Sequence, residues 1–391
     1  MSKKNIVIYG ATGSIGTSTL NLIRNNMSKF NIVGMTCNNN IDQLLKLSIE
    51  FNCKNIGIAN KDAIYKKNIK TDNIKIFSGL SEFKDIINEC HVDIIIFGIS
   101  GSSSLSLLLY LASSGKILGL ANKECIICAG SLFMHKIKSS FTKLVPLDSE
   151  HNAIYHLIKN KQKNSIKNYL ITASGGNFYN YKYEDLKKIK PEIAVTHPKW
   201  KMGNKISIDS STLMNKGLEL IEASILFDIN EKNIDAIIHP ESIVHGIVNF
   251  KDYSSHAFLS QPNMEISISS VLFNEEIFYS NNYNLDLTEI GSLNFHKINI
   301  ENFNSLSLAK IAIKNGGLLP AVLNYSNELM VSKFLHKKAL FTDITLNNEL
   351  IMNKFLLDGN NIDNPSIQDI FNSFDIIDDY FSSQDILIIN K

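Results

Sequence analysis

The chain has 391 residues, of which 44% are hydrophobic and 20% are charged, and its formal net charge is +1. This length exceeds what one ordinary hydrophobic core serves, so two or three domains are expected. The nearly balanced charge excludes a broad electrostatic attraction to nucleic acid or to an anionic membrane surface.

The cysteines and the N-terminus favour a reducing compartment. Five scattered cysteines, an odd number, argue against a disulfide framework. Cys125 and Cys128 form a CxxC, but the apolar Ile126 and Ile127 between them predict buried thiols rather than a zinc or redox site. After Lys4 the chain enters an apolar stretch without the pattern of a signal peptide, and no apolar run approaches the roughly 18 residues that span a bilayer. We therefore expect a cytoplasmic protein.

The first part of the chain alternates short apolar runs with helical patterns. The expected strands are residues 5–9, 30–35, 56–59, 93–97 and 116–120, and the expected helices are 17–24, 44–51 and 105–112. Such alternation predicts a Rossmann-like, doubly wound parallel sheet with helices on both faces.

The pattern of expected strands and helices changes near residue 170. Expected strands at 169–172, 206–208, 234–239 and 245–250 predict a second α/β domain, and helices at 306–315, 320–335 and 367–380 predict a small helical domain. The polar stretch 281–302 has poor periodicity and is typical of a linker. The domains expected are therefore 1–148 for the cofactor, 149–275 for catalysis, 276–302 as linker and 303–391 as C-terminal helices.

Three glycines, Gly10, Gly13 and Gly16, follow the first expected strand and precede a helix. At this position backbone amides can hold a pyrophosphate at the helix N-terminus. The spacing is GxxGxxG rather than the usual GxGxxG, so a tight turn without a ligand stays open as an alternative.

The tip of the second strand predicts which dinucleotide binds. NAD-binding folds usually place an acidic residue there for the ribose hydroxyls, about 20 residues after the glycines. Residues 36–40 read TCNNN and contain no acid, which favours NADP over NAD. No Arg or Lys is present to attract the 2′-phosphate.

Two acidic segments carry most of the chemistry. Asp148 and Glu150 stand one residue apart in LDSEHN, and Glu219 ends the stretch DSSTLMNKGLE at 209–219. Folded together, these three carboxylates would supply oxygen ligands for Mg²⁺ or Mn²⁺, or for Co²⁺, with positions left for substrate oxygens. Nearby Ser, Asn and Lys residues suit a phosphorylated, hydroxylated substrate. Taken singly, each acid is more simply a solvated surface charge.

These two blocks, with ANKE at 121–124, ASGGN at 173–177, THPKWKMG at 196–203 and HPESIVH at 239–245, resemble the 1-deoxy-D-xylulose 5-phosphate reductoisomerase family over nearly the whole length. The resemblance implies an NADPH- and metal-dependent oxidoreductase that converts 1-deoxy-D-xylulose 5-phosphate to 2-C-methyl-D-erythritol 4-phosphate in non-mevalonate isoprenoid biosynthesis. It further implies a skeletal rearrangement by a retro-aldol/aldol or an α-ketol route, followed by hydride reduction. A homodimer is also implied.

The resemblance also implies residue roles. Asp148, Glu150 and Glu219 would bind the metal. The residues expected to act in catalysis are Lys123, Glu150, His151, His197 and His245. Substrate contacts are expected from Lys123, Ser149, Glu150, Ser174, His197, Trp200, Met202, Ser210, Asn215, Lys216 and Glu219. NADPH contacts are expected from Thr12, Gly13, Ser14, Ile15, Asn38, Asn39, Asn40, Asn122, Glu124 and Gly203. The family usually has a Gly and a basic residue where this chain has Asn38 and Asn39.

From the residues alone, two other functions remain possible. A simple NADP oxidoreductase of the homoserine or semialdehyde type shares the two-domain plan but needs no three carboxylates. A non-catalytic NADP-sensing regulator would have no use for a metal surrounded by Ser174, Asn215 and Lys216. Metal-dependent turnover of a sugar phosphate separates both from the family reading.

Overall fold

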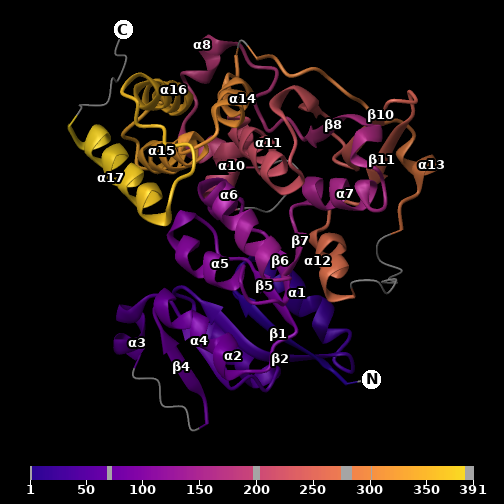
Figure 1. Cartoon of the computed structure of the whole chain (residues 1–391), viewed down its shortest axis with the longest axis vertical. Coiled ribbons are helices and arrows are strands. Elements are labelled where there is room, and N and C mark those ends of the chain that lie inside the picture. Colours follow the sequence, from indigo (N-terminus) through magenta and orange to yellow (C-terminus); the bar gives the residue numbers. More distant parts are fainter. Residues whose placement is uncertain (1, 68–72, 197–202, 274–283, 301, 384–391) are drawn as a thin grey trace. The chain divides into compact units, whose positions relative to one another are not determined.

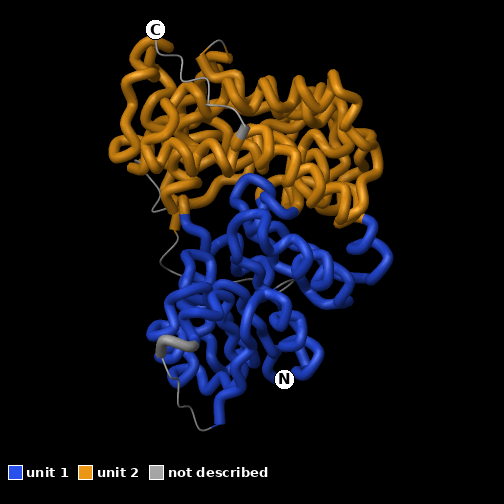
Figure 2. Tube along the Cα trace, turned by 90° about the vertical axis from the view of Figure 1, so that its left-hand side faces the viewer, with its two compact units in different colours: residues 1–125, 135–152, 263–281 blue, residues 126–134, 153–262, 282–391 orange. Residues whose placement is uncertain are grey.

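The computed structural model describes residues 2–67, 73–196, 203–273, 284–300 and 302–383. The chain divides into two compact units (Figure 2), and each contains segments that are distant in sequence. Unit 1 comprises Met1–Cys125, His135–Asn152 and Asn263–Asn281, and unit 2 comprises Ile126–Met134, Ala153–Pro262 and Asn282–Lys391. Within the described ranges, every helix is too short or too polar to cross a membrane.

Unit 1 is built on a seven-stranded sheet in which all neighbouring strands are parallel. Its strands are β1 (Lys4–Tyr9), β2 (Phe30–Cys37), β3 (Asn55–Ile58), β4 (Lys75–Ser78), β5 (Ile94–Phe97), β6 (Ile117–Leu120) and β7 (Lys143–Pro146). They lie in the order β4-β3-β2-β1-β5-β6-β7, so the winding direction reverses between β1 and β5. The doubly wound prediction is confirmed, and ligands in such folds bind at this reversal point.

Helices of unit 1 connect these strands, as Figure 1 shows. They are α1 (Ser14–Arg24), α2 (Ile41–Glu50), α3 (Lys61–Lys67), α4 (Phe83–Glu89) and α5 (Leu105–Leu111), and α6 (Lys123–Ser139) and α7 (Ser149–Ile158) begin in this unit. A late segment, α12 (Met264–Leu272), also belongs here. A Cβ on Gly119 of β6 would meet the Val271 side chain at 3.0 Å, so α12 packs closely on the sheet. Residues 263–273 therefore belong to unit 1, whereas the sequence groups them with residues 149–275.

Unit 2 contains a mixed four-stranded sheet, in the order β11-β10-β8-β9. Its strands are β8 (Ile166–Ala173), β9 (Ile234–Ile238), β10 (Val244–Phe250) and β11 (Ser255–Leu259), and only β8 and β9 run parallel. Its described helices are α8 (Tyr183–Leu186), α9 (Pro191–Ala194), α10 (Asn204–Ser211), α11 (Met214–Phe227), α13 (Leu287–Ile290), α14 (Ser305–Asn315), α15 (Leu319–Leu335), α16 (Phe341–Leu357) and α17 (Ile367–Ser383). The second α/β fold and the C-terminal helices are thus confirmed, and they form one unit rather than two.

One predicted strand was wrong. Residues 206–208 lie inside α10, where the Ser207 amide donates to Gly203 O and the Thr212 amide donates to Ile208 O. The Ile-Ser-Ile alternation suggested a strand, but Ser207, Ile208 and Asp209 are all buried, so packing on several sides decided the conformation. The expected linker also has structure, since it includes α13 and an isolated β-bridge between His296 and Ile238 at the end of β9.

Candidate functional site

The glycine turn after β1 is tightly built. Gly10 has φ +87°, and a Cβ there would lie 2.8 Å from Gly98 O, so the position requires glycine. The Gly10 amide donates to Thr36 Oγ1 at 3.0 Å, which ties the turn to the end of β2. Gly13 is the N-cap of α1 without a side-chain cap, and Gly13 and Ser14 are exposed. The N-terminus of α1 is therefore exposed at Gly13 and Ser14, where a pyrophosphate could meet the first helical amides. Thr12 and Ile15 flank them, half-buried.

The tip of β2 presents amides rather than charges. Asn38, Asn39 and Asn40 are exposed. Asn40 accepts a hydrogen bond from the Gln43 amide and caps α2, and Asn39 Oδ1 accepts from Asn60 Nδ2 at 2.7 Å. Burial raises the pKa of the preceding Cys37 thiol to about 11, so this side chain stays neutral near pH 7.

Two of the predicted cofactor residues follow β6 and are buried. Asn122 is fully buried, donates to Ile99 O at 2.5 Å and Gly101 O at 2.9 Å, and accepts from the Cys125 amide at 2.6 Å. Its side chain thus caps α6 and holds the loop after β5. Any contact that Asn122 makes with a dinucleotide would therefore use its backbone. Glu124 is also buried, and the burial predicted for Cys125 and Cys128 is confirmed.

Lys123 and Asp148 meet at the carboxyl edge of the unit 1 sheet. Lys123 begins α6 just after β6, and Asp148 follows the adjacent β7. Lys123 Nζ lies 2.6 Å from Asp148 Oδ2, and both side chains are largely buried. Because parallel strands end at the same sheet edge, residues 25 positions apart converge there.

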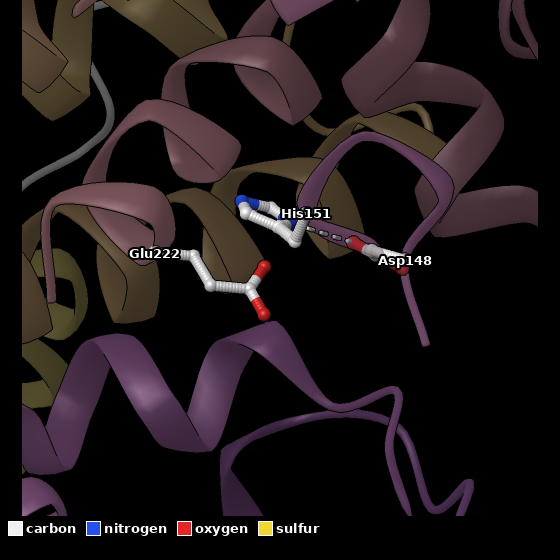
Figure 3. A group of neighbouring side chains, drawn as sticks. All are labelled: Asp148, His151 and Glu222. Carbon is white, nitrogen blue, oxygen red and sulfur yellow. Dashed lines mark ion pairs between the residues drawn. The ribbon is translucent and has the colours of Figure 1, made fainter. Parts of the chain in front are cut away.

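The start of α7 gathers the other predicted groups of this edge. Asp148, Ser149 and Glu150 are half-buried, directly after the buried end of β7. Ser149 Oγ donates to Glu150 Oε2 at 2.6 Å. Fully buried His151 has its Nδ1 4.0 Å from Asp148 Oδ2, as drawn in Figure 3. This histidine lies beside Asp148 and is buried.

In unit 2 the loop after β8 lies against the last turn of α10. The Ser174 loop follows β8, and a Cβ on Gly176 in that loop would lie 2.8 Å from Ser210 O. Gly176 also has φ +65°, so both conformation and space require glycine there. The half-buried side chains of Ser174 and Ser210 thus belong to a loop and a helix end that adjoin.

The first turns of α11 hold the remaining predicted groups of unit 2. Asn215 Nδ2 donates to Glu219 Oε1 at 2.5 Å, and Lys216 Nζ forms an ion pair with Glu219 Oε2. Glu219 and Lys216 are both buried, and Asn215 is half-buried. One buried carboxylate therefore orients both an ammonium and an amide, two good donors for a phosphate.

The structure adds one carboxylate that sequence reasoning missed. Glu222 lies on α11 one turn after Glu219, and only 1% of it is exposed (Figure 3). A charged residue is rarely buried so fully without a role or a partner. The sequence signal that could have identified Glu222 was its position within an otherwise apolar helical pattern.

The other predicted residues are less informative. His245 is buried on β10, and its Nε2 lies 3.3 Å from Ser260 O. Gly203 is the exposed N-cap of α10. His197, Trp200 and Met202 lie outside the described residues.

The predicted metal ligands are of a type that suits a hard divalent cation. Asp148 and Glu150 belong to unit 1, and Glu219 belongs to unit 2. All three are carboxylates, which Mg²⁺ and Mn²⁺ prefer over softer ligands. Asp148 and Glu219 each form an ion pair with a lysine.

Family models match most of the chain. The model described as 1-deoxy-D-xylulose 5-phosphate reductoisomerase matches residues 6–130, and two models of the enzyme's C-terminal domains match 144–227 and 259–376. A reductoisomerase of Thermoanaerobacter sp. (strain X514) is 40% identical over 372 residues, which cover 94% of this chain and 96% of that protein. The one of Clostridium perfringens (strain 13 / Type A) is 40% identical over 357 residues, covering 90% and 93%.

Solved structures agree over the full length. A DOX-P reductoisomerase in complex with NADPH, fosmidomycin and magnesium has a TM-score of 0.90 and 33% identity, and the match covers 99% of both chains. The Zymomonas mobilis enzyme in complex with NADPH has a TM-score of 0.86 and 33% identity, with 96% of this chain and 97% of that chain covered. The chain belongs to the 1-deoxy-D-xylulose 5-phosphate reductoisomerase family.

Proposed function

We infer that this chain converts 1-deoxy-D-xylulose 5-phosphate to 2-C-methyl-D-erythritol 4-phosphate, using NADPH and a divalent metal. The observation that carries this function is the arrangement on α11, where Glu219 holds both Lys216 and Asn215. A metal-binding carboxylate and two phosphate donors within five consecutive residues suit a substrate that carries a phosphate and chelating oxygens. Relatives of known activity support the same conclusion over nearly the whole chain.

We propose Asp148, Glu150 and Glu219 as the metal ligands, with Mg²⁺ as the ion, and Mn²⁺ or Co²⁺ as substitutes. Magnesium is present in a solved relative with 33% identity. When bound, such a cation stabilises negative charge that develops on adjacent carbonyl and hydroxyl oxygens of the substrate. In this role Lys123 holds the Asp148 carboxylate, Ser149 holds that of Glu150, and His151 is a catalytic candidate beside Asp148.

The phosphate would be held by Ser174, Ser210, Asn215 and Lys216. Lys216 supplies the positive charge, and the two hydroxyls and the amide supply directional hydrogen bonds. At the reacting end, Lys123 and Ser149 donate to substrate oxygens, and the Lys123 ammonium polarises the carbonyl that is reduced. We also propose His197, Trp200, Met202 and His245 as residues that line the substrate site.

NADPH supplies the hydride. We propose that its pyrophosphate lies on residues 12–15, at the N-terminus of α1, and its 2′-phosphate at residues 38–40. Asn122, Glu124 and Gly203 are proposed to contact the rest of the cofactor. The exposed N-terminus of α1 and the uncharged tip of β2 support this assignment.

We propose a cytoplasmic homodimer. The cysteines, all of them within described residues, form no disulfide, as a reducing compartment favours. Strand β11 lies at one end of its sheet with Ser255, His256 and Ala257 exposed, and such an edge can pair with a second copy. Light scattering after size-exclusion chromatography would measure the mass in solution, and a monomer at micromolar concentration would contradict the dimer.

The activity is tested by NADPH oxidation in the presence of 1-deoxy-D-xylulose 5-phosphate, with and without Mg²⁺. We expect turnover only when both are present, and abolition by EDTA that added Mg²⁺ reverses. Fosmidomycin should inhibit, and its binding should require the metal, because its hydroxamate oxygens replace the chelating oxygens of the substrate and its phosphonate replaces the phosphate. Metal-independent turnover would favour the simple oxidoreductase, and no turnover at all would favour the sensor.

A further inference from the structure

A series of buried hydrogen bonds links helices α15 and α16 of unit 2 to α10. Asp209, on the last turn of α10, accepts from Asn327 Nδ2 of α15 at 2.7 Å and from Lys205 Nζ at 2.8 Å. Asn327 Oδ1 accepts from Asn348 Nδ2 of α16 at 3.1 Å, and Asn348 Oδ1 accepts from Ser326 Oγ at 2.9 Å. Of these side chains only that of Lys205 has appreciable exposure.

All the hydrogen bonds between these side chains run in one direction, from donor to acceptor towards Asp209. Each amide donates towards Asp209 and accepts from the side chain behind it. Reversing Asn327 would set its oxygen against the Asp209 carboxylate, and reversing Asn348 would set its oxygen against Asn327 Oδ1, so either reversal places acceptor against acceptor. A buried carboxylate is costly unless it is paired and hydrogen-bonded. Here Asn327 of α15 and Lys205 of α10 supply both interactions. The network therefore fixes the position of Asp209 closely.

Asp209 directly precedes Ser210, a residue proposed to bind the phosphate. Between residues 207 and 223, all of them described, only Ser210 and Asn215 are not buried. The turn between them is fixed by a second C-terminal residue, because Ser305 Oγ of α14 donates to Thr212 O at 2.8 Å. The next residue, Leu213, has φ +58°, a strained conformation that such support maintains.

We propose that Asp209 and Asn327 are positioning residues for the phosphate-binding segment 210–216. The C-terminal helices, through this pair, hold Ser210 and Asn215 in register with Lys216. Neither Asp209 nor Asn327 contacts the substrate. The inference rests on the proposed function of the segment, and it adds a role for helices that contribute none of the predicted ligands.

The test compares two Asn→Leu variants of α15. Asn327→Leu removes the donor to Asp209, and we expect the KM for the sugar phosphate and the Ki of inorganic phosphate to rise about tenfold, at the low end for hydrogen bonds to charged groups. The KM for NADPH should stay unchanged. Asn324→Leu is the matched control, since Asn324 is equally buried on the same helix but donates to Glu328 and Cys128 instead. It should lower thermal stability without raising either phosphate constant.

A reciprocal exchange keeps the test decisive if Asn327→Leu does not fold. Asn327→Asp alone opposes two carboxylates and should raise the phosphate constants. Adding Asp209→Asn restores the pattern, because Asn at 209 can accept from Lys205 and donate to Asp at 327, which also accepts from Asn348. The double variant should recover most of the substrate KM, as direct coupling predicts.

The inference is overturned if both leucine variants behave alike, or if the exchange gives no recovery. Wild-type protein without turnover would instead refute the proposed activity. In that case inorganic phosphate still tests the positioning, because calorimetric titration with phosphate should show weaker binding to Asn327→Leu than to Asn324→Leu. Equal phosphate affinity in those two variants would reject it.

Discussion

Lys123 Nζ lies 2.6 Å from Asp148 Oδ2, so the ammonium proposed to polarise the substrate carbonyl contacts a proposed metal ligand. The pair is largely buried, and Lys123 also neutralises part of the charge that gathers at this sheet edge. Replacing the lysine should therefore affect chemistry more than binding.

We expect Lys123→Gln to lower kcat by about a hundred- to a thousandfold, the range for loss of one preorganised electrostatic donor. The KM for NADPH should change little. Steady-state kinetics would measure both, with Lys138→Gln on the exposed face of the same helix as a control of equal charge. A Lys123→Gln enzyme with near-normal kcat would remove this residue from the reaction.

Glu219→Gln tests the metal site. A neutral amide is a far poorer ligand for a hard cation, so turnover should fall by orders of magnitude, since the cation supplies several kcal/mol to the transition state. The circular dichroism spectrum should remain that of the folded protein. Titration of Mn²⁺ into the variant should show weakened binding, whereas Glu289→Gln, at an exposed residue of α13, should bind it normally. Near-normal activity of Glu219→Gln in Mg²⁺ would show that the three-carboxylate assignment is wrong.

Lys216→Met tests the phosphate site. Removing a point charge from the dianion should raise the KM for 1-deoxy-D-xylulose 5-phosphate about ten- to a hundredfold, as for lost hydrogen bonds to charged groups. The KM for NADPH should barely move. Lys232→Met, at an exposed residue of the same unit, serves as the control. Equal damage to both KM values would mean that Lys216 contacts the cofactor or supports the fold.

The tip of β2 should prefer NADPH over NADH, by a smaller margin than in relatives with a cation there. Asn39→Lys should lower the KM for NADPH about five- to tenfold at low salt, and the gain should shrink as ionic strength rises. Asn31→Lys, exposed at the opposite end of the same strand, adds the same charge as a control. A wild-type preference for NADH, or no response to Asn39→Lys, would show that this tip does not read the ribose.

Local patterns in the sequence predicted the doubly wound fold and five of its seven strands, whereas β4 and β7 were missed. Short apolar runs alternate with amphipathic segments there, and a parallel sheet buries both faces of each strand. The glycine turn was also predicted from the sequence, because three glycines follow the first strand. The structure adds that Gly10 has φ +87° and closely approaches Gly98. The types of residue in 148–152 and 209–219 also pointed to a metal and a phosphate before any fold was known.

Contacts between distant segments were decided only by the tertiary structure. Residues 206–208 show the alternation of a strand but lie within α10. The helix places Asp209 in the interior, where it accepts a hydrogen bond from Asn327. The return of α12 to the first sheet depends on the fit of Val271 against Gly119, which no local period encodes. Asn122 is predicted to contact the cofactor, and only the structure shows that its side chain caps α6. Sequence periodicity reports which face of an element is apolar, whereas the partner of that face is chosen by packing across the whole chain.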